Sequence, residues 1–134
     1  MVDFIVEIPK GKTPIILQLS DPQMLDSSQA VEGRLSPGED TYWAKDKKEE
    51  RCFKYIRETV SATSPDLILI AGDMVYGEFD HDGSALTSFV DFMEGLGIPW
   101  APVLGNHESE SRMVLIGNVS SFIMLKIACS SSAH

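Results

Sequence analysis

Residues 66–73 read DLILIAGD, and this stretch decides the fold. Residues 66–71 predict the clearest strand of the chain, since a short apolar run that ends in turn residues is typical of a strand. The turn pair is Gly72-Asp73, which places a carboxylate directly after the strand. The fold then follows from the segments that stand on either side.

The segments around this strand alternate between strand and helix patterns. The apolar run at 15–19 predicts a buried strand, and residues 98–104 predict another. Residues 44–62 and 85–96 carry apolar side chains at helical spacing, so two amphipathic helices are expected. A short strand with one solvent-facing side is predicted at 3–8.

This alternation predicts an α/β fold. Strand, helix, strand, helix, strand is the order of βαβ units, which build a parallel sheet with right-handed crossovers. Residues 24–42 are rich in Ser, Gly, Asp and Pro and predict a long loop. Loops of this length are usually functional or disordered, and we expect this one to help decide the substrate.

The composition is that of one soluble globular domain of 134 residues, 43% of them hydrophobic and 23% charged. Twenty acidic residues against eleven Lys and Arg give a net charge of −9, which argues against nucleic acid as a bound partner. No apolar run is long enough to cross a membrane, and the first residues lack the pattern of a signal peptide. We therefore expect a cytoplasmic protein with no membrane partner. Cys52 and Cys129 form no disulfide framework or metal motif.

Polar side chains that can bind metal follow three of the predicted strands. Asp21 follows the first, Asp73 the second, and Asn106 and His107 the third. Because the carboxyl ends of parallel strands meet at one edge of a sheet, we expect these side chains to lie close together. Carboxylate, amide and imidazole donors suit Mn, Fe or Zn. Each residue type is also common in turns, so an alternative is that they only shape loops.

The sequences LSDPQ at 19–23, GDM at 72–74 and GNHE at 105–108 resemble the first three motifs of calcineurin-like metallophosphoesterases. That superfamily includes purple acid phosphatases and phosphodiesterases. The resemblance covers residues 14–110. It implies a four-layer αββα sandwich, of which this chain is the βαβαβ front half. It also implies hydrolysis of small phosphate esters by a water that two metal ions activate.

The resemblance implies a role for each residue. Asp21 binds the first of two metal ions (Mn, Fe or Zn), Asp73 bridges both ions, and Asn106 binds the second. His107 binds no metal and stabilises or protonates the leaving group. Gln23 stands where the family usually has a histidine, and its amide oxygen is expected to be a harder and weaker ligand.

The resemblance also predicts a division of the chain. Residues 1–112 are expected to form the N-terminal half of a phosphoesterase domain. Residues 113–134 form an atypical tail in which Lys126 is the one charged side chain. Later motifs of the family need further histidines, and neither His81 nor His134 fits one. Our hypothesis is a truncated chain whose tail is out-of-frame or misfolded sequence.

Two other functions stay open at this point. The chain could be a non-catalytic remnant or a metal-binding module that lacks the C-terminal histidine ligands. It could also be an unrelated α/β domain whose motifs are only turns. The sequence does not predict an oligomeric state. If the second sheet of the sandwich is missing, apolar surface of the first sheet is expected to be exposed.

Two further features have structural interpretations. Residues 80–83, DHDG, resemble a calcium loop with its glycine out of place, and a solvated turn is expected instead. Tyr42, Trp43 and Trp100 could line a substrate mouth, but packing in the core or at its rim is the more frequent role of such residues.

Overall fold

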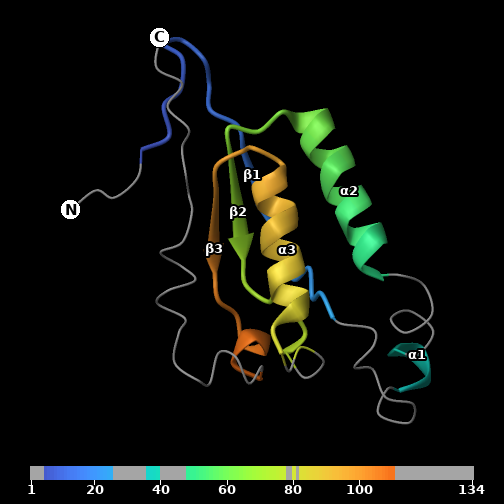
Figure 1. Cartoon of the computed structure of the whole chain (residues 1–134). Helices are drawn as coiled ribbons and strands as arrows, with labels where there is room; N and C mark the ends of the chain where they lie inside the picture. Colours follow the sequence, from blue (N-terminus) through green and yellow to red (C-terminus); the bar gives the residue numbers. More distant parts are fainter. Residues whose placement is uncertain (1–4, 26–35, 40–47, 78–79, 81, 111–134) are drawn as a thin grey trace.

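The computed structural model of this chain defines residues 5–25, 36–39, 48–77, 80 and 82–110. Three parallel strands form one sheet in the order β1-β2-β3, with β1 at Ile16–Leu19, β2 at Leu67–Ala71 and β3 at Trp100–Val103 (Figure 1). The strand that the sequence identified first, β2, is therefore the central one.

Helix α2 (Lys48–Thr63) joins β1 to β2, and helix α3 (Ser84–Gly95) joins β2 to β3. A single helical turn, α1 (Pro37–Glu39), lies between β1 and α2, and the 3-10 helix η3 (His107–Glu110) follows β3 (Figure 1). The α/β class and the βαβαβ order are confirmed. Neither of the two long helices in the described ranges is long and apolar enough to cross a membrane.

The core lies between the sheet and the two long helices. Ile68 and Ile70 of β2 are fully buried and join one apolar cluster with Ile56 of α2 and with Phe89 and Met93 of α3. Alternate side chains of a strand point to opposite faces of a sheet, so these contacts define one covered face. Both helices therefore cover the same face of the sheet.

The opposite face of the sheet is open among the described residues. Ile16 of β1 is 56% exposed and Val103 of β3 is 64% exposed, and Leu67 and Leu69 between them are half-buried. The prediction that residues 15–19 form a buried strand is wrong, because β1 lies at the edge of the described sheet and only one of its faces is covered. Whether a second layer covers this face stays a prediction, because it depends on residues outside the described ranges.

Some predicted boundaries shift and others lie outside the described residues. Residues 5–8 form no strand, in contrast to the prediction for 3–8. In the predicted loop at 24–42, Met24 and Leu25 are completely buried, so its start belongs to the core. Outside the described residues lie positions 26–35 and 40–47, which include Tyr42 and Trp43, as well as His81 and the tail at 113–134.

A buried carboxylate starts helix α3. Asp80 is completely buried and accepts hydrogen bonds from the amides of Ala85 (2.8 Å) and Leu86 (3.3 Å) in the first turn of the helix. The predicted turn is present, with the amide of Gly83 donating to the carbonyl of Asp80 (3.4 Å), but Asp80 itself is buried and not solvated. The free amides at a helix start need acceptors, and this carboxylate accepts from two of them.

Trp100, for which packing in the core or at its rim is the predicted role, is 7% exposed and contacts the ring of Phe89 edge-on.

One-sided packing gives an expected difference between two aliphatic residues of the sheet. Ile70→Ala removes buried side-chain volume and should lower the free energy of unfolding by about 2–5 kcal/mol. Val103→Ala, on the open face, should change it by less than about 0.5 kcal/mol. Urea denaturation of both variants measures the two values. Equal losses would mean that the face carrying Val103 is also covered.

Candidate functional site

The predicted site residues all follow the carboxyl ends of the three strands. Asp21 lies two residues after β1, Asp73 two residues after β2, and Asn106 three residues after β3. The strands are parallel, so these positions share one edge of the sheet. Asp73 is buried, with 8% exposure, whereas Asp21 and Asn106 are exposed and Gln23 is half-buried.

Backbone hydrogen bonds continue beyond the strands and bring the first two segments together. The amide of Asp21 donates to the carbonyl of Gly72 (3.3 Å), and the amide of Gln23 donates to the carbonyl of Asp73 (2.9 Å). One pair further on, the amide of Met24 donates to the carbonyl of Met74. The polar residues after β1 and β2 are therefore held side by side by main-chain contacts.

Three of these residues adopt backbone conformations that are unusual for residues other than glycine. Asp21, Gln23 and Asp73 have φ values of 52°, 45° and 48°, in the left-handed region. Each such residue costs about 1 kcal/mol or more, and such conformations cluster at functional sites. The hydrogen bonds between the two segments offset this cost.

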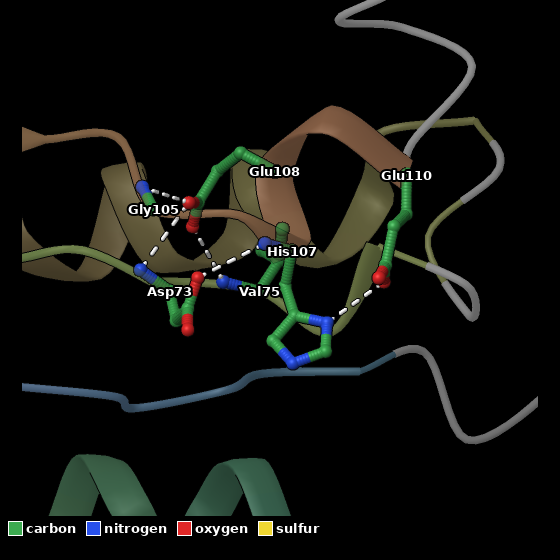
Figure 2. Close-up of polar contacts among 6 residues, drawn as sticks. All are labelled: Asp73, Val75, Gly105, His107, Glu108 and Glu110. Atoms are coloured by element: carbon green, nitrogen blue, oxygen red, sulfur yellow. Dashed lines mark hydrogen bonds and ion pairs between the residues drawn. The ribbon is translucent and has the colours of Figure 1, made fainter.

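The carboxylate of Asp73 lies directly against the backbone of the segment after β3. A Cβ atom on Gly105 would lie 2.1 Å from Oδ1 of Asp73 and 2.5 Å from its amide nitrogen. A Cβ atom on Gly72 would lie 3.2 Å from Cα of Gly105. The amide of His107 donates a hydrogen bond to the same Oδ1 (3.0 Å) (Figure 2). Glycine at 105 is therefore required for this carboxylate to sit where it does.

A second buried carboxylate lies behind Asp73. Glu108, with 1% exposure, accepts hydrogen bonds from the amides of Gly105 (2.6 Å), Asp73 (3.2 Å) and Val75 (3.2 Å) (Figure 2). The donors come from the segments after β2 and β3, so one side chain joins both. These bonds compensate a charge that would be costly to bury alone.

The ring of His107 is oriented by two neighbours. Its Nδ1 lies 2.8 Å from Oε2 of Glu110 (Figure 2). Its ring centroid lies 4.7 Å from that of Tyr76. A carboxylate can only accept, so Nδ1 carries the proton of this hydrogen bond. Nε2 therefore holds a proton only when the ring is cationic. The hydrogen bond to Glu110 raises the pKa of His107 above its ordinary value, with Asp73 and Glu108 adding smaller contributions.

The side chains at this edge form an oxygen-rich donor set. Asp21 and Asp73 offer carboxylates, and Gln23 and Asn106 offer amide oxygens, which suit a hard divalent ion such as Mn²⁺. Within the described ranges, no group of three or more His, Cys, Asp or Glu side chains is placed to hold a metal ion. The residues present therefore fit part of a coordination sphere.

The structure adds site residues that the sequence reasoning did not single out. From the sequence, Glu108 has no predicted role beyond its place at the end of a motif, and no role is predicted for Glu110 or Tyr76. The contact between Glu110 and His107 could have been predicted from their spacing, because side chains three residues apart on a helical turn face each other. The position of Tyr76 could not have been predicted, since it depends on how the segments after β2 and β3 meet.

Comparison with known proteins identifies the family. The family model described as calcineurin-like phosphoesterase matches residues 15–131. That match covers most of the chain, and it agrees with the α/β sheet and with the polar residues gathered at its carboxyl edge. This chain belongs to the calcineurin-like phosphoesterase family. The match extends into the tail beyond residue 112, so the division of the chain there stays a prediction.

Two curated relatives come from Arabidopsis thaliana. "Probable inactive purple acid phosphatase 14" is 32% identical over 100 residues, which is 73% of this chain and 24% of that protein. "Probable inactive purple acid phosphatase 28" is 36% identical over 61 residues, which is 45% of this chain and 15% of that protein. The chain therefore spans about a quarter or less of the length of these relatives. No solved structure matches it significantly.

The contact between residues 73 and 105 gives a test of the site's packing. Gly105→Ala places a methyl group where the backbone and carboxylate of Asp73 stand, and it should lower the free energy of unfolding by about 1–3 kcal/mol. Gly95→Ala is the control, because that helical glycine has open space around it. This variant should have a free energy of unfolding higher by up to about 1 kcal/mol. Thermal and urea denaturation compare the two. Equal tolerance of both would contradict the close approach.

The pair formed by His107 and Glu110 gives a pH prediction for the metal-free chain. A proton NMR titration should find the pKa of His107 above 6.5, and Glu110→Gln should return it toward that value. Since the folded-state pKa is raised, the pair stabilises the fold below the unfolded-state pKa. That stability is lost as the pH rises through the folded-state pKa. Glu58→Gln, an exposed carboxylate beside Lys54, is the control and should leave the titration unchanged.

Proposed function

We propose that this chain supplies the metal-binding strand ends of an enzyme that hydrolyses phosphate esters. Asp21, Asp73 and Asn106 would hold the metal ions, with Asp73 shared between two of them and Gln23 as a weaker additional ligand. Water or residues outside the described ranges would complete the coordination. The observation that carries the proposal is the placement of Asp73, whose buried carboxylate is fixed by the His107 amide and fitted against Gly105.

Metal ions in such a site would polarise the phosphoryl group and lower the pKa of a bound water. The chain needs this positive charge, because its net charge of −9 repels a phosphate ester at long range. The carboxylates of Asp21 and Asp73 would bind the metal cations at one edge of the sheet. The substrate class is therefore a phosphate ester that this chain binds only when cations are present.

His107 is the proposed acid for the leaving group. Glu110 holds Nδ1–H, so a proton on Nε2 belongs to the cationic ring and can be given to a departing oxygen. The raised pKa of His107 increases the fraction of cationic ring near neutral pH. Its own amide donates to Oδ1 of Asp73, so the backbone that carries the proposed proton donor is held beside the metal-binding carboxylate.

A second candidate is a metal-binding protein without turnover. Both relatives described above are named as inactive purple acid phosphatases. Gln23, in place of the histidine usual in the family, also weakens the first metal site. This candidate keeps the metal ligands and removes only the hydrolysis, so binding and turnover must be measured separately.

The test combines Mn²⁺ binding by calorimetry with hydrolysis of p-nitrophenyl phosphate by the 134-residue chain. The proposal expects Mn²⁺-dependent hydrolysis that Asp73→Asn lowers more than about 100-fold, since loss of a ligand exceeds the 10–100-fold cost of losing a supporting residue. Asp91→Asn, an exposed change on α3, is the control and should keep full activity. Binding without turnover would favour the second candidate, and the absence of binding would exclude both.

A further inference from the structure

Glu108 is a buried acid for which the proposed chemistry has no use. Its side chain is among the largest that are fully buried, and none of the ion pairs formed within the described ranges includes it. A buried carboxylate without a cation persists only where hydrogen bonds compensate its charge. Here all the compensation comes from backbone amides, of Asp73, Val75 and Gly105.

The division of these bonds between the two oxygens is informative. Oε2 accepts from Gly105 at 2.6 Å and from Asp73 at 3.2 Å, so a single atom joins the segments that follow β2 and β3. Oε1 accepts from Val75 at 3.2 Å, two residues beyond Asp73. The carboxylate thereby holds the main chain on both sides of residue 74 and sets its distance from Gly105.

This distance determines where the carboxylate of Asp73 lies. Its Oδ1 stands in the space that a Cβ atom on Gly105 would need, and the same oxygen accepts the amide of His107. If the two segments separated, the hydrogen bond from His107 would lengthen and the left-handed backbone of Asp73 would lose support. The hydrogen bonds that Glu108 accepts come from backbone amides, so it acts on this carboxylate through the backbone.

We infer that Glu108 is a positioning residue, which sets the geometry of the metal-binding carboxylate of Asp73 through three backbone amides. The inference rests on the proposed function, in which Asp73 is a metal ligand. A residue of this kind supports affinity without binding the ion, and loss of such support costs about 10–100-fold in metal affinity.

The test uses Glu108→Gln, which keeps the size of the side chain but replaces one acceptor oxygen by a donor NH₂. Whichever way the amide lies, at least one of the three N–H groups then faces another donor. The matched control is Asp80→Asn, the same chemical change in another fully buried carboxylate, which accepts hydrogen bonds from the amides of Ala85 and Leu86. Both variants should lower the urea midpoint.

The deciding measurement is calorimetric titration of Mn²⁺ into the folded 134-residue chain and both variants. Glu108→Gln should weaken Mn²⁺ binding about 10–100-fold, and Asp80→Asn should leave it unchanged. In the metal-free variant, amide hydrogen exchange should also speed up at residues 73, 75 and 105. If Glu108→Gln does not fold, Glu108→Asp replaces it, since it keeps the charge but shortens the reach, and its Mn²⁺ affinity should still fall.

Equal Mn²⁺ affinity in the original chain and the Glu108 variant would overturn the inference and leave the proposed function intact. Equal weakening in both variants would also overturn it, because the effect would then follow stability rather than position. If the original chain binds no Mn²⁺, the proposed function fails first, and the positioning role fails with it.

Discussion

The carboxylate of Asp73 occupies the space in which a side chain on residue 105 would begin. This contact requires that the turns after β2 and β3 touch, backbone against backbone, and both turns use glycine to do so. The amide of His107 then donates a hydrogen bond to Asp73, and the side chain of Glu108 accepts hydrogen bonds from amides of both turns. The arrangement of the candidate site is the consequence of this one close approach.

The sheet makes that approach possible. β2 is central, and β1 and β3 are parallel to it, so all three chains leave the sheet at the same edge (Figure 1). The helices α2 and α3 stabilise the sheet from one face through Ile56, Phe89 and Met93. The opposite face, with Ile16 and Val103 exposed, contributes little to stability within the described part of the chain. The site therefore depends on a frame whose packing is one-sided.

Local patterns predicted most of this frame. Apolar runs identified β2 and β3, helical spacing identified α3, and parallel topology placed Asp21, Asp73 and Asn106 at one edge. The predictions failed where the answer depends on packing that the local pattern does not show. A run such as 15–19 looks the same at an edge as in the middle of a sheet, and Asp80 looks like a turn residue until the helix it caps is seen.

The site shows the same limit more sharply. The motif that contains Asn106 and His107 was recognised from the sequence, but what the neighbouring acids do was not. Glu108 is buried because its acceptors meet amides from residues more than thirty positions away, at 73 and 75. Spacing along the chain carries no record of such partners. Glu110 was within reach of a local argument, because it pairs with a residue on its own helical turn.

The four residues at 105–108 have two kinds of role, one for the outer pair and one for the inner pair. Gly105 and Glu108 are needed for the turns to pack, whereas Asn106 is exposed and the ring of His107 contacts Tyr76 and Glu110 rather than the turns, so the packing of the turns depends on the first and last residues. A family member without catalytic activity would be free to change the inner pair only, while selection for a folded chain would retain the outer two. Half of such a signature can thus outlive the activity it once marked.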